Sequence, residues 1–166
     1  GGGMNRLLIM SCSATKSSHA LPLAAIDRYT GPIWQTLKAT DPGLNLAHLT
    51  VLSAEHGWID GHQPITNYNR KMDNLRGREL IVRGITAEVA AMLGESSGYS
   101  RRPFTEVCIV GGHYYQAVAQ ELVREAANSL ECFTPDVRIV EICDQVGFMR
   151  QRLRAWLLAG IEQVAA

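Results

Sequence analysis

The chain has 166 residues, of which 46% are hydrophobic and 19% are charged, and its 16 basic side chains are balanced by 16 acidic ones. This length fits one domain with a sizeable core, and the composition excludes a disordered or highly charged protein. A formal net charge of zero gives no global positive field, so any binding of nucleic acid must depend on a local patch.

The chain begins with three glycines before Met4, which we interpret as a tag remnant at residues 1–3 ahead of a single α/β domain at 4–166. No basic segment followed by an apolar stretch indicates a signal peptide, and no apolar run approaches the roughly 20 residues of a membrane span. The four cysteines lack metal-ligand spacing, which favours a reduced chain with no metal or other cofactor. We therefore expect a cytoplasmic location without membrane contact.

Four short apolar runs are typical of strands that are buried on both faces and that end in polar loops. They lie at residues 7–10, 46–52, 107–110 and 137–142. Helical apolar stripes are expected after Pro32 and at residues 81–93, 114–126 and 149–164. This alternation predicts a Rossmann-like, three-layer α/β domain, with a mostly parallel sheet of about four strands and helices on both faces.

Two connections between these elements are unusually long. Residues 54–77 have no sustained apolar period and carry several aromatic and charged side chains, so we expect a long functional loop there. Residues 94–103 are expected to form a surface linker.

The loop after the first predicted strand is a candidate anion site. In an open parallel sheet, ligands bind outside the carboxyl ends of the strands. Ser11, Cys12, Ser13 and Lys16 offer hydroxyls, a thiol and a cation that can hold a phosphate, without the glycines of a P-loop. The alternatives are a polar loop with a solvated lysine and, for Cys12, either a nucleophile or a small buried residue.

The loop after the third predicted strand is a second anion-site candidate. Gly111 and Gly112 permit close backbone approach, and the helix that follows presents unpaired N–H groups. A plain strand-to-helix turn would use glycine as well. Of the two tyrosines that follow, one is expected in the core, and Tyr114 is our candidate for stacking on a base.

The most reactive combination follows the second predicted strand. Glu55 and His56 are candidate catalytic residues, because a carboxylate beside an imidazole can act as nucleophile or general base. Adjacent residues in a strand face opposite sides, so their joint use requires a turn, which Gly57 permits. The alternative is a surface glutamate beside a histidine that bonds to backbone. Asp144, at the end of the fourth predicted strand, is the reserve carboxylate.

Two stretches carry a local positive excess. Residues 69–83 hold five basic side chains against two acidic ones, a net +3, and residues 147–154 hold three arginines and no acid. Placed near the strand ends they would form a phosphate-binding groove; elsewhere they would be solvated helix faces.

Several motifs in chain order resemble a bacterial and phage family whose members are often labelled peroxide-stress YaaA-like proteins. The resemblance covers about residues 6–115. It is carried by Ser11-Cys12 with Lys16, Tyr29-Thr30-Gly31-Pro32, Ser53-Ala54 with His56-Gly57, Pro64 with Tyr68, and Gly111-Gly112 with Tyr114. It implies an α/β domain in a nucleotide or nucleic-acid context and no established reaction. The position of Glu55 is usually Lys in that family, so a catalytic role for Glu55 is not implied by it.

These observations predict an enzyme that acts on a nucleotide or nucleic-acid base, by hydrolysis or transfer at an N-glycosidic bond. The partner would be a phosphate-bearing small molecule or a nucleic acid. The alternatives are a noncatalytic stress-response protein that binds DNA or nucleotides, and a sugar-phosphate enzyme of another class. The remaining substrate-binding candidates are Tyr29, Gly31, Ser53, Tyr68 and Arg70.

Overall fold

The structure is a computed structural model that describes residues 5–94 and 102–165. The expected tag remnant at residues 1–3 lies outside the described residues, as does most of the expected surface linker at 94–103. No helix within the described ranges is both long enough and apolar enough to cross a membrane.

The fold is α/β, with a mostly parallel sheet in the order β4-β3-β1-β6-β7. The four predicted strands are confirmed and run parallel, but the sheet has five strands, because a short antiparallel strand pairs with β3 at one edge. The strands are β1 (Arg6–Ser11), β3 (His48–Ser53), β4 (Gly57–Asp60), β6 (Phe104–Val110) and β7 (Phe133–Ile142). The sequence did not indicate β4, because four residues are too few to display an alternating apolar pattern.

Three of the four expected helices are present, and the fourth is divided in two. The confirmed helices are α2 (Pro32–Thr40), α5 (His113–Ser129) and α6 (Val146–Ala165). In place of one helix at 81–93 the chain forms α3 (Asn74–Arg83) and α4 (Ala87–Met92). Gly84, with φ of 65°, ends α3, and the side chain of Thr86 accepts a hydrogen bond from the Val89 amide to begin α4.

The segment expected as a long loop at 54–77 is therefore largely structured. It contains β4, the start of α3, and β5 (Pro64–Ile65), which pairs with β2 (Leu23–Ala24) in a separate two-stranded sheet. The short helix α1 (Ala25–Arg28) follows β2 directly. The apolar pattern did not predict β2, α1, β4 and β5, because each is only two to four residues long.

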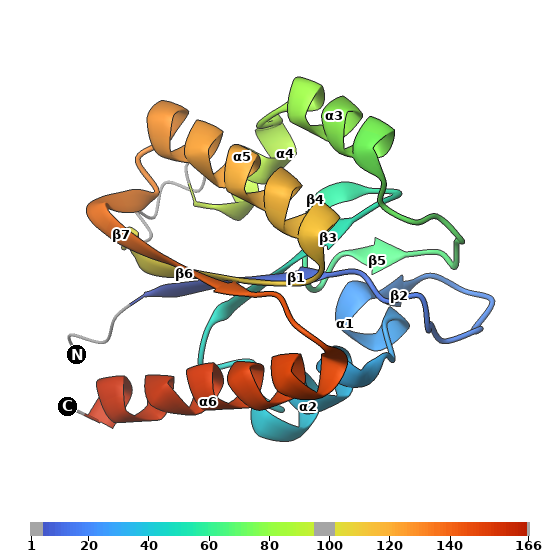
Figure 1. Cartoon of the computed structure of the whole chain (residues 1–166), viewed down its shortest axis with the longest axis horizontal. Coiled ribbons are helices and arrows are strands. Elements are labelled where there is room, and N and C mark those ends of the chain that lie inside the picture. The colour runs from blue at the N-terminus through green and yellow to red at the C-terminus, as the bar shows by residue number, and fades with distance from the viewer. Residues whose placement is uncertain (1–4, 95–101, 166) are drawn as a thin grey trace.

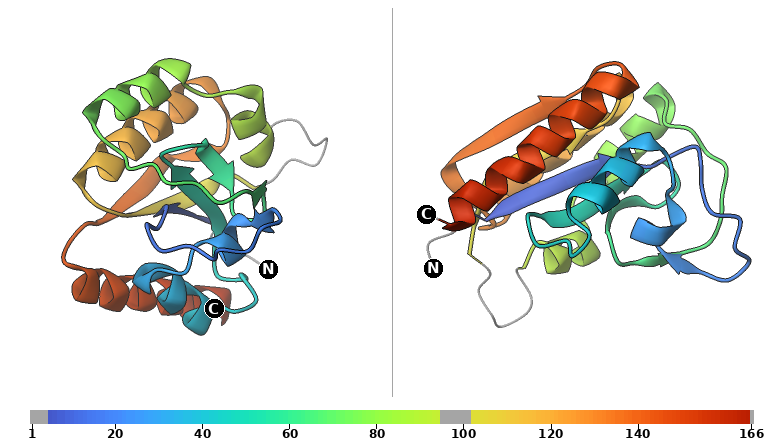
Figure 2. Two further views of the ribbon diagram at one scale, coloured as in Figure 1. Left: turned by 90° about the vertical axis from the view of Figure 1, so that its right-hand side faces the viewer. Right: turned by 90° about the horizontal axis from the view of Figure 1, so that it is seen from below.

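The sheet separates two apolar cores, and alternate residues of β1 face each of them. Leu7 and Ile9 pack in one core, whereas Leu8 and Met10 pack in the other. Figure 1 and Figure 2 show α3, α4 and α5 on one side of the sheet and α2 and α6 on the opposite side. Helices that cover both faces explain why the parallel strands read as continuous apolar runs.

A buried polar cluster fastens α6 to the sheet. The Arg6 guanidinium lies 3.5 Å from the centre of the Trp156 ring and donates a hydrogen bond to the Trp156 carbonyl. The Trp156 indole N–H in turn donates to the Glu106 carboxylate at 2.7 Å. Since Arg6 and Glu106 are buried, these contacts replace the water that their charges lose.

Trp156→Phe should lower the free energy of unfolding by about 1 to 3 kcal/mol, because the buried Glu106 carboxylate loses its indole donor. Urea denaturation at pH 7 measures this difference. The control is Ile161→Ala on the same helix, whose side chain is 49% exposed and should change stability by about 0.5 kcal/mol or less. Equal stabilities of parent and Trp156→Phe would show that the indole N–H does not stabilise the fold.

Candidate functional site

The strand order reverses at the carboxyl edge between β1 and β6. From β1 the chain crosses to β3 on one side, and it later returns to β6 on the other side of β1. The helices that follow β1 and β6, α2 and α5, lie on opposite faces of the sheet (Figure 1). Such a reversal is where ligands bind in open parallel sheets.

The loops after β1 and β6 are in direct contact at this edge. The Cys12 thiol lies 3.0 Å from the Tyr115 hydroxyl, in a hydrogen bond that either group can donate. A Cβ added to Gly111 would lie 2.7 Å from the Cβ of Ser11, so only glycine fits at that position. Gly111 therefore serves close packing of the two loops.

Gly112 differs from its neighbour because the space beside it is open. No heavy atom would lie within 4 Å of a Cβ at Gly112. Gly112 is the N-cap of α5 and supplies no side chain to cap it. The first N–H groups of α5 are thus available to an acceptor that approaches from outside.

Five side chains form a second group at the carboxyl edge, which we call the Tyr68 cluster. The Tyr68 hydroxyl lies 2.6 Å from the Tyr29 hydroxyl and 2.8 Å from the Ser53 hydroxyl. The Lys16 Nζ lies 4.5 Å from the centre of the Tyr68 ring, and the His56 ring contacts the same ring edge-on at a centroid distance of 5.3 Å. The structure thereby brings together Lys16, Tyr29, Ser53, His56 and Tyr68, all named as candidates from the sequence.

Burial determines the protonation of this cluster. It raises the pKa of Tyr29 to about 12 and also raises the pKa of Tyr68, so both hydroxyls keep their protons at neutral pH. Burial lowers the pKa of Lys16, an effect that the nearby Cys12 opposes. Burial likewise lowers the pKa of His56, while Glu55 acts in the opposite direction. His56 is consequently neutral at pH 7 and can accept a proton.

Glu55 and His56 lie in a tight turn between β3 and β4. Gly57 adopts a φ of 77°, which reverses the chain directly after His56. The Ser53 hydroxyl accepts hydrogen bonds from the amides of Glu55 and His56 at 3.2 and 3.0 Å. The buried Arg76 donates to the carbonyls of Ala54 at 2.6 Å and Glu55 at 2.8 Å. The turn is thus held from both sides.

Arg76 is a residue that the sequence analysis did not single out. It appeared there only as one charge in a basic stretch, because nothing in a sequence distinguishes a buried arginine from a solvated one. In the structure it joins the turn to α3, and it also contacts Glu79 at 3.0 Å.

The Glu55 carboxylate faces Arg70. Their charged atoms lie 3.6 Å apart, and Arg70 also lies 3.8 Å from Glu79. These side chains are roughly 40% exposed, so the ion pairs contribute little to stability. The His56 ring packs against Tyr68 instead, and its Nε2 atom is buried with no hydrogen-bond partner in the described part of the chain.

The remaining sequence candidates have other surroundings. Ser13 lies against Gly31, where any Cβ would clash with the Ser13 hydroxyl, so Gly31 serves packing. Tyr114 is 51% exposed, and the inward tyrosine is its neighbour Tyr115. Tyr115 lies three residues before Val118 and seven before Leu122, a helical spacing that would have identified Tyr115 as the inward tyrosine. Asp144 is exposed and accepts a hydrogen bond from the adjacent Gln145 amide.

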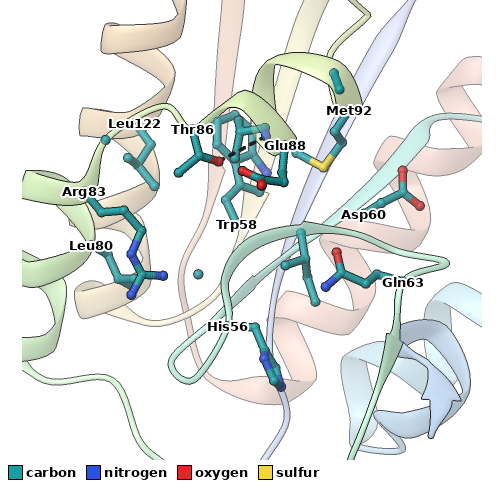
Figure 3. Close-up of a pocket in the computed structure, with 15 residues that line it drawn as sticks. His56, Trp58, Asp60, Gln63, Leu80, Arg83, Thr86, Glu88, Met92 and Leu122 are labelled. Atoms are coloured by element: carbon teal, nitrogen blue, oxygen red, sulfur yellow. Dashed lines mark hydrogen bonds between the residues drawn. The ribbon is translucent and has the colours of Figure 1, made fainter.

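A hollow of about 500 Å³ lies on the other side of the β3–β4 turn. It is bounded by β4, α3 and α4 (Figure 3) and shares His56 and Gly57 with the turn. The other members of the Tyr68 cluster do not line it. The carboxyl edge and this hollow are therefore separate surfaces that adjoin the same turn.

Cys12, Cys108 and Cys143 are free thiols, and no group of three or more His, Cys, Asp and Glu side chains within residues 5–94 and 102–165 is arranged to hold a metal ion. No family model, curated protein or solved structure matches the chain. The resemblance to the YaaA-like proteins accordingly stays a prediction from the motifs.

His56 should make stability depend on pH below its ordinary pKa of 6.5. Because burial lowers the pKa in the folded state, the unfolded chain binds more protons between the two pKa values. The stabilisation by neutral His56 is fully present above pH 6.5 and is lost as the pH falls through the folded-state pKa.

Urea denaturation of the parent and of His56→Gln at several pH values between 7.5 and 5 tests this effect. Other titrating groups cancel in the difference between the two proteins. The stability of the parent relative to His56→Gln should decrease as the pH is lowered. A difference that stays constant or increases towards acid pH would contradict the burial of this imidazole.

Proposed function

We propose that the protein is an enzyme that binds a nucleotide or nucleic-acid base at the carboxyl edge and acts at its N-glycosidic bond. The phosphate would lie beside Gly112, at the carboxyl edge between β1 and β6. The observation that carries this proposal is the open space at Gly112, where the uncapped start of α5 adjoins the reversal of strand order. A helix start at such a reversal suits an anionic ligand.

The groups that the reaction needs are available near this edge. Lys16 and the α5 amides bind the phosphate, and Tyr114 or the Tyr68 ring stacks on the base. Glu55 stabilises positive charge on the sugar as the C–N bond breaks. His56, neutral at pH 7 because burial lowers its pKa, accepts the proton of the attacking water.

We also propose a more specific fold and family for the chain. The helices on either side of the sheet would make the chain a Rossmann-like, three-layer domain, and the resemblance over residues 6–115 would relate it to the YaaA-like proteins. Both support a nucleotide context, since nucleotides commonly bind at the strand ends of such sheets.

Lys16→Ala should weaken the binding of adenosine monophosphate about ten- to a hundredfold, through loss of a charge-assisted contact of about 1.5 to 3 kcal/mol. The substitution leaves the backbone bridge between Lys16 and Tyr29 in place, so the loop is retained. Isothermal titration calorimetry gives the dissociation constants. The exposed Lys71→Ala serves as the control and should bind like the parent. Unchanged affinity in Lys16→Ala would remove this lysine from the anion site.

Glu55→Gln should keep nucleotide affinity but lower turnover from severalfold to many thousandfold, because the amide retains the shape and loses the charge. Release of free base from a panel of nucleotides and oligonucleotides measures turnover. Glu79→Gln is the control, since Glu79 contacts the same Arg70 and has no part in the reaction. A parental rate in Glu55→Gln would move the role to another carboxylate, with Asp144 the next to test.

The noncatalytic DNA-binding alternative would use the basic side chains of α6 together with the exposed Lys71, Arg78 and Arg83. Arg150 and Arg154 line a hollow of about 350 Å³ between α2 and α6, whereas Arg70 and Arg76 in the other basic stretch are paired with acids. If the parent consumes no nucleotide, nucleoside or oligonucleotide, this alternative is favoured. DNA affinity should then fall steeply with salt, and the slope counts the phosphates contacted.

A further inference from the structure

The hollow beside the β3–β4 turn has the form of a small-molecule site. Its volume of about 500 Å³ is within the usual range of ligand pockets. The buried side chains of Trp58, Leu80, Val89 and Leu122 contribute an apolar floor. Burying an apolar group of a ligand against these side chains would supply the hydrophobic part of binding.

Two opposite charges stand in this hollow without partners. Arg83 enters from α3 and Glu88 from α4 (Figure 3). Within the described ranges neither side chain forms an ion pair or a side-chain hydrogen bond, although other arginines of the same region contact carboxylates. A guanidinium and a carboxylate that line one pocket and do not meet each other can bind a ligand that carries both opposite charges.

The backbone is shaped to admit the guanidinium. A Cβ added to Gly57 would lie 3.3 Å from the nearest guanidinium nitrogen of Arg83 and 3.4 Å from Leu80, and the φ of 77° favours glycine there in any case. Gly84, with its φ of 65°, separates α3 from α4 and so places the two charges on different helices. Gly57 therefore leaves room for the Arg83 guanidinium beside Leu80.

We propose that this hollow is a second ligand site, distinct from the carboxyl edge, that binds an amphipathic zwitterion: an α-amino acid with a large apolar side chain, or a dipeptide of such residues. The ligand carboxylate pairs with Arg83, its ammonium group with Glu88, and its apolar side chain covers Trp58. A purely anionic ligand would leave Glu88 facing a like charge, and a purely cationic ligand would do the same to Arg83. The site does not depend on the function proposed for the carboxyl edge.

Titration of the full chain with four probes tests the assignment. L-phenylalanine carries both charges, 3-phenylpropanoate lacks the ammonium group, 2-phenylethylamine lacks the carboxylate, and leucyl-leucine is the longer zwitterion. Calorimetry measures affinity, and the NMR signal of the Trp58 indole N–H reports on the site. That N–H donates to the buried Thr50 hydroxyl, so its signal is assigned by its loss in Trp58→Phe.

At least one zwitterion should shift the Trp58 signal and bind about tenfold or more tightly than either singly charged probe. Preference between phenylalanine and leucyl-leucine distinguishes a free amino acid from a short peptide. Equal affinities for the zwitterion and for either singly charged probe would overturn the proposal. So would the absence of any shift at millimolar concentrations of both zwitterions.

Variants at the two charges locate the ligand groups. Arg83→Gln should weaken phenylalanine about ten- to a hundredfold, whereas 2-phenylethylamine should bind as well or better because a like charge is removed. Glu88→Gln should likewise weaken phenylalanine, with 3-phenylpropanoate bound as well or better. Both side chains are exposed, so the variants should fold normally. Arg78→Gln, an exposed arginine of α3 that does not line the hollow, is the control. Parental affinity in Arg83→Gln or in Glu88→Gln would refute the site.

Discussion

Strand β1 must pair on both sides and pack on both faces, and every element of the site depends on this requirement. All six of its residues are buried, and it forms parallel ladders with β3 and β6. A strand in that position admits few charges, and the one it carries, Arg6, is compensated by the Trp156 carbonyl and by stacking on its ring. Because the three strands run in the same direction, their three following loops must meet at one edge.

The turn after β3 separates the carboxyl edge from the hollow beside β4. Hydrogen bonds to the Ser53 hydroxyl and from the Arg76 side chain of α3 fix the conformation of this turn. The carboxyl edge lies on one side of the turn and the hollow on the other. On one side His56 packs against Tyr68, and on the other Gly57 admits the Arg83 guanidinium. The reaction proposed for the first surface and the zwitterion site proposed for the second can be tested by separate substitutions, because Glu55 and Arg83 belong to different surfaces.

For two candidate glycines the structure gives a packing reason for the residue type. Gly111 was named from a strand-end motif and Gly31 from a helix-start motif, and at each position an added Cβ would clash with a neighbouring serine. At Gly112 no atom would lie within 4 Å of an added Cβ, and the anion site expected there from the sequence stays a prediction. A glycine in a sequence can mean that a neighbouring side chain leaves no room for a Cβ, or that the backbone must stay open to a ligand. Only the residues that pack around it in the structure distinguish the two cases.

The sequence by itself determined the class of fold and the edge of the sheet where polar side chains gather, because buried parallel strands require continuous apolar runs and their loops require polar residues. It also indicated Lys16, Ser53, His56 and Tyr68 as candidates. Only the tertiary structure decided that these four side chains meet, that Tyr115 rather than Tyr114 points inward, that Arg76 is buried, and that β4 and α4 enclose a hollow. These contacts join residues far apart along the chain, and they depend on loop paths that local periodicity does not encode.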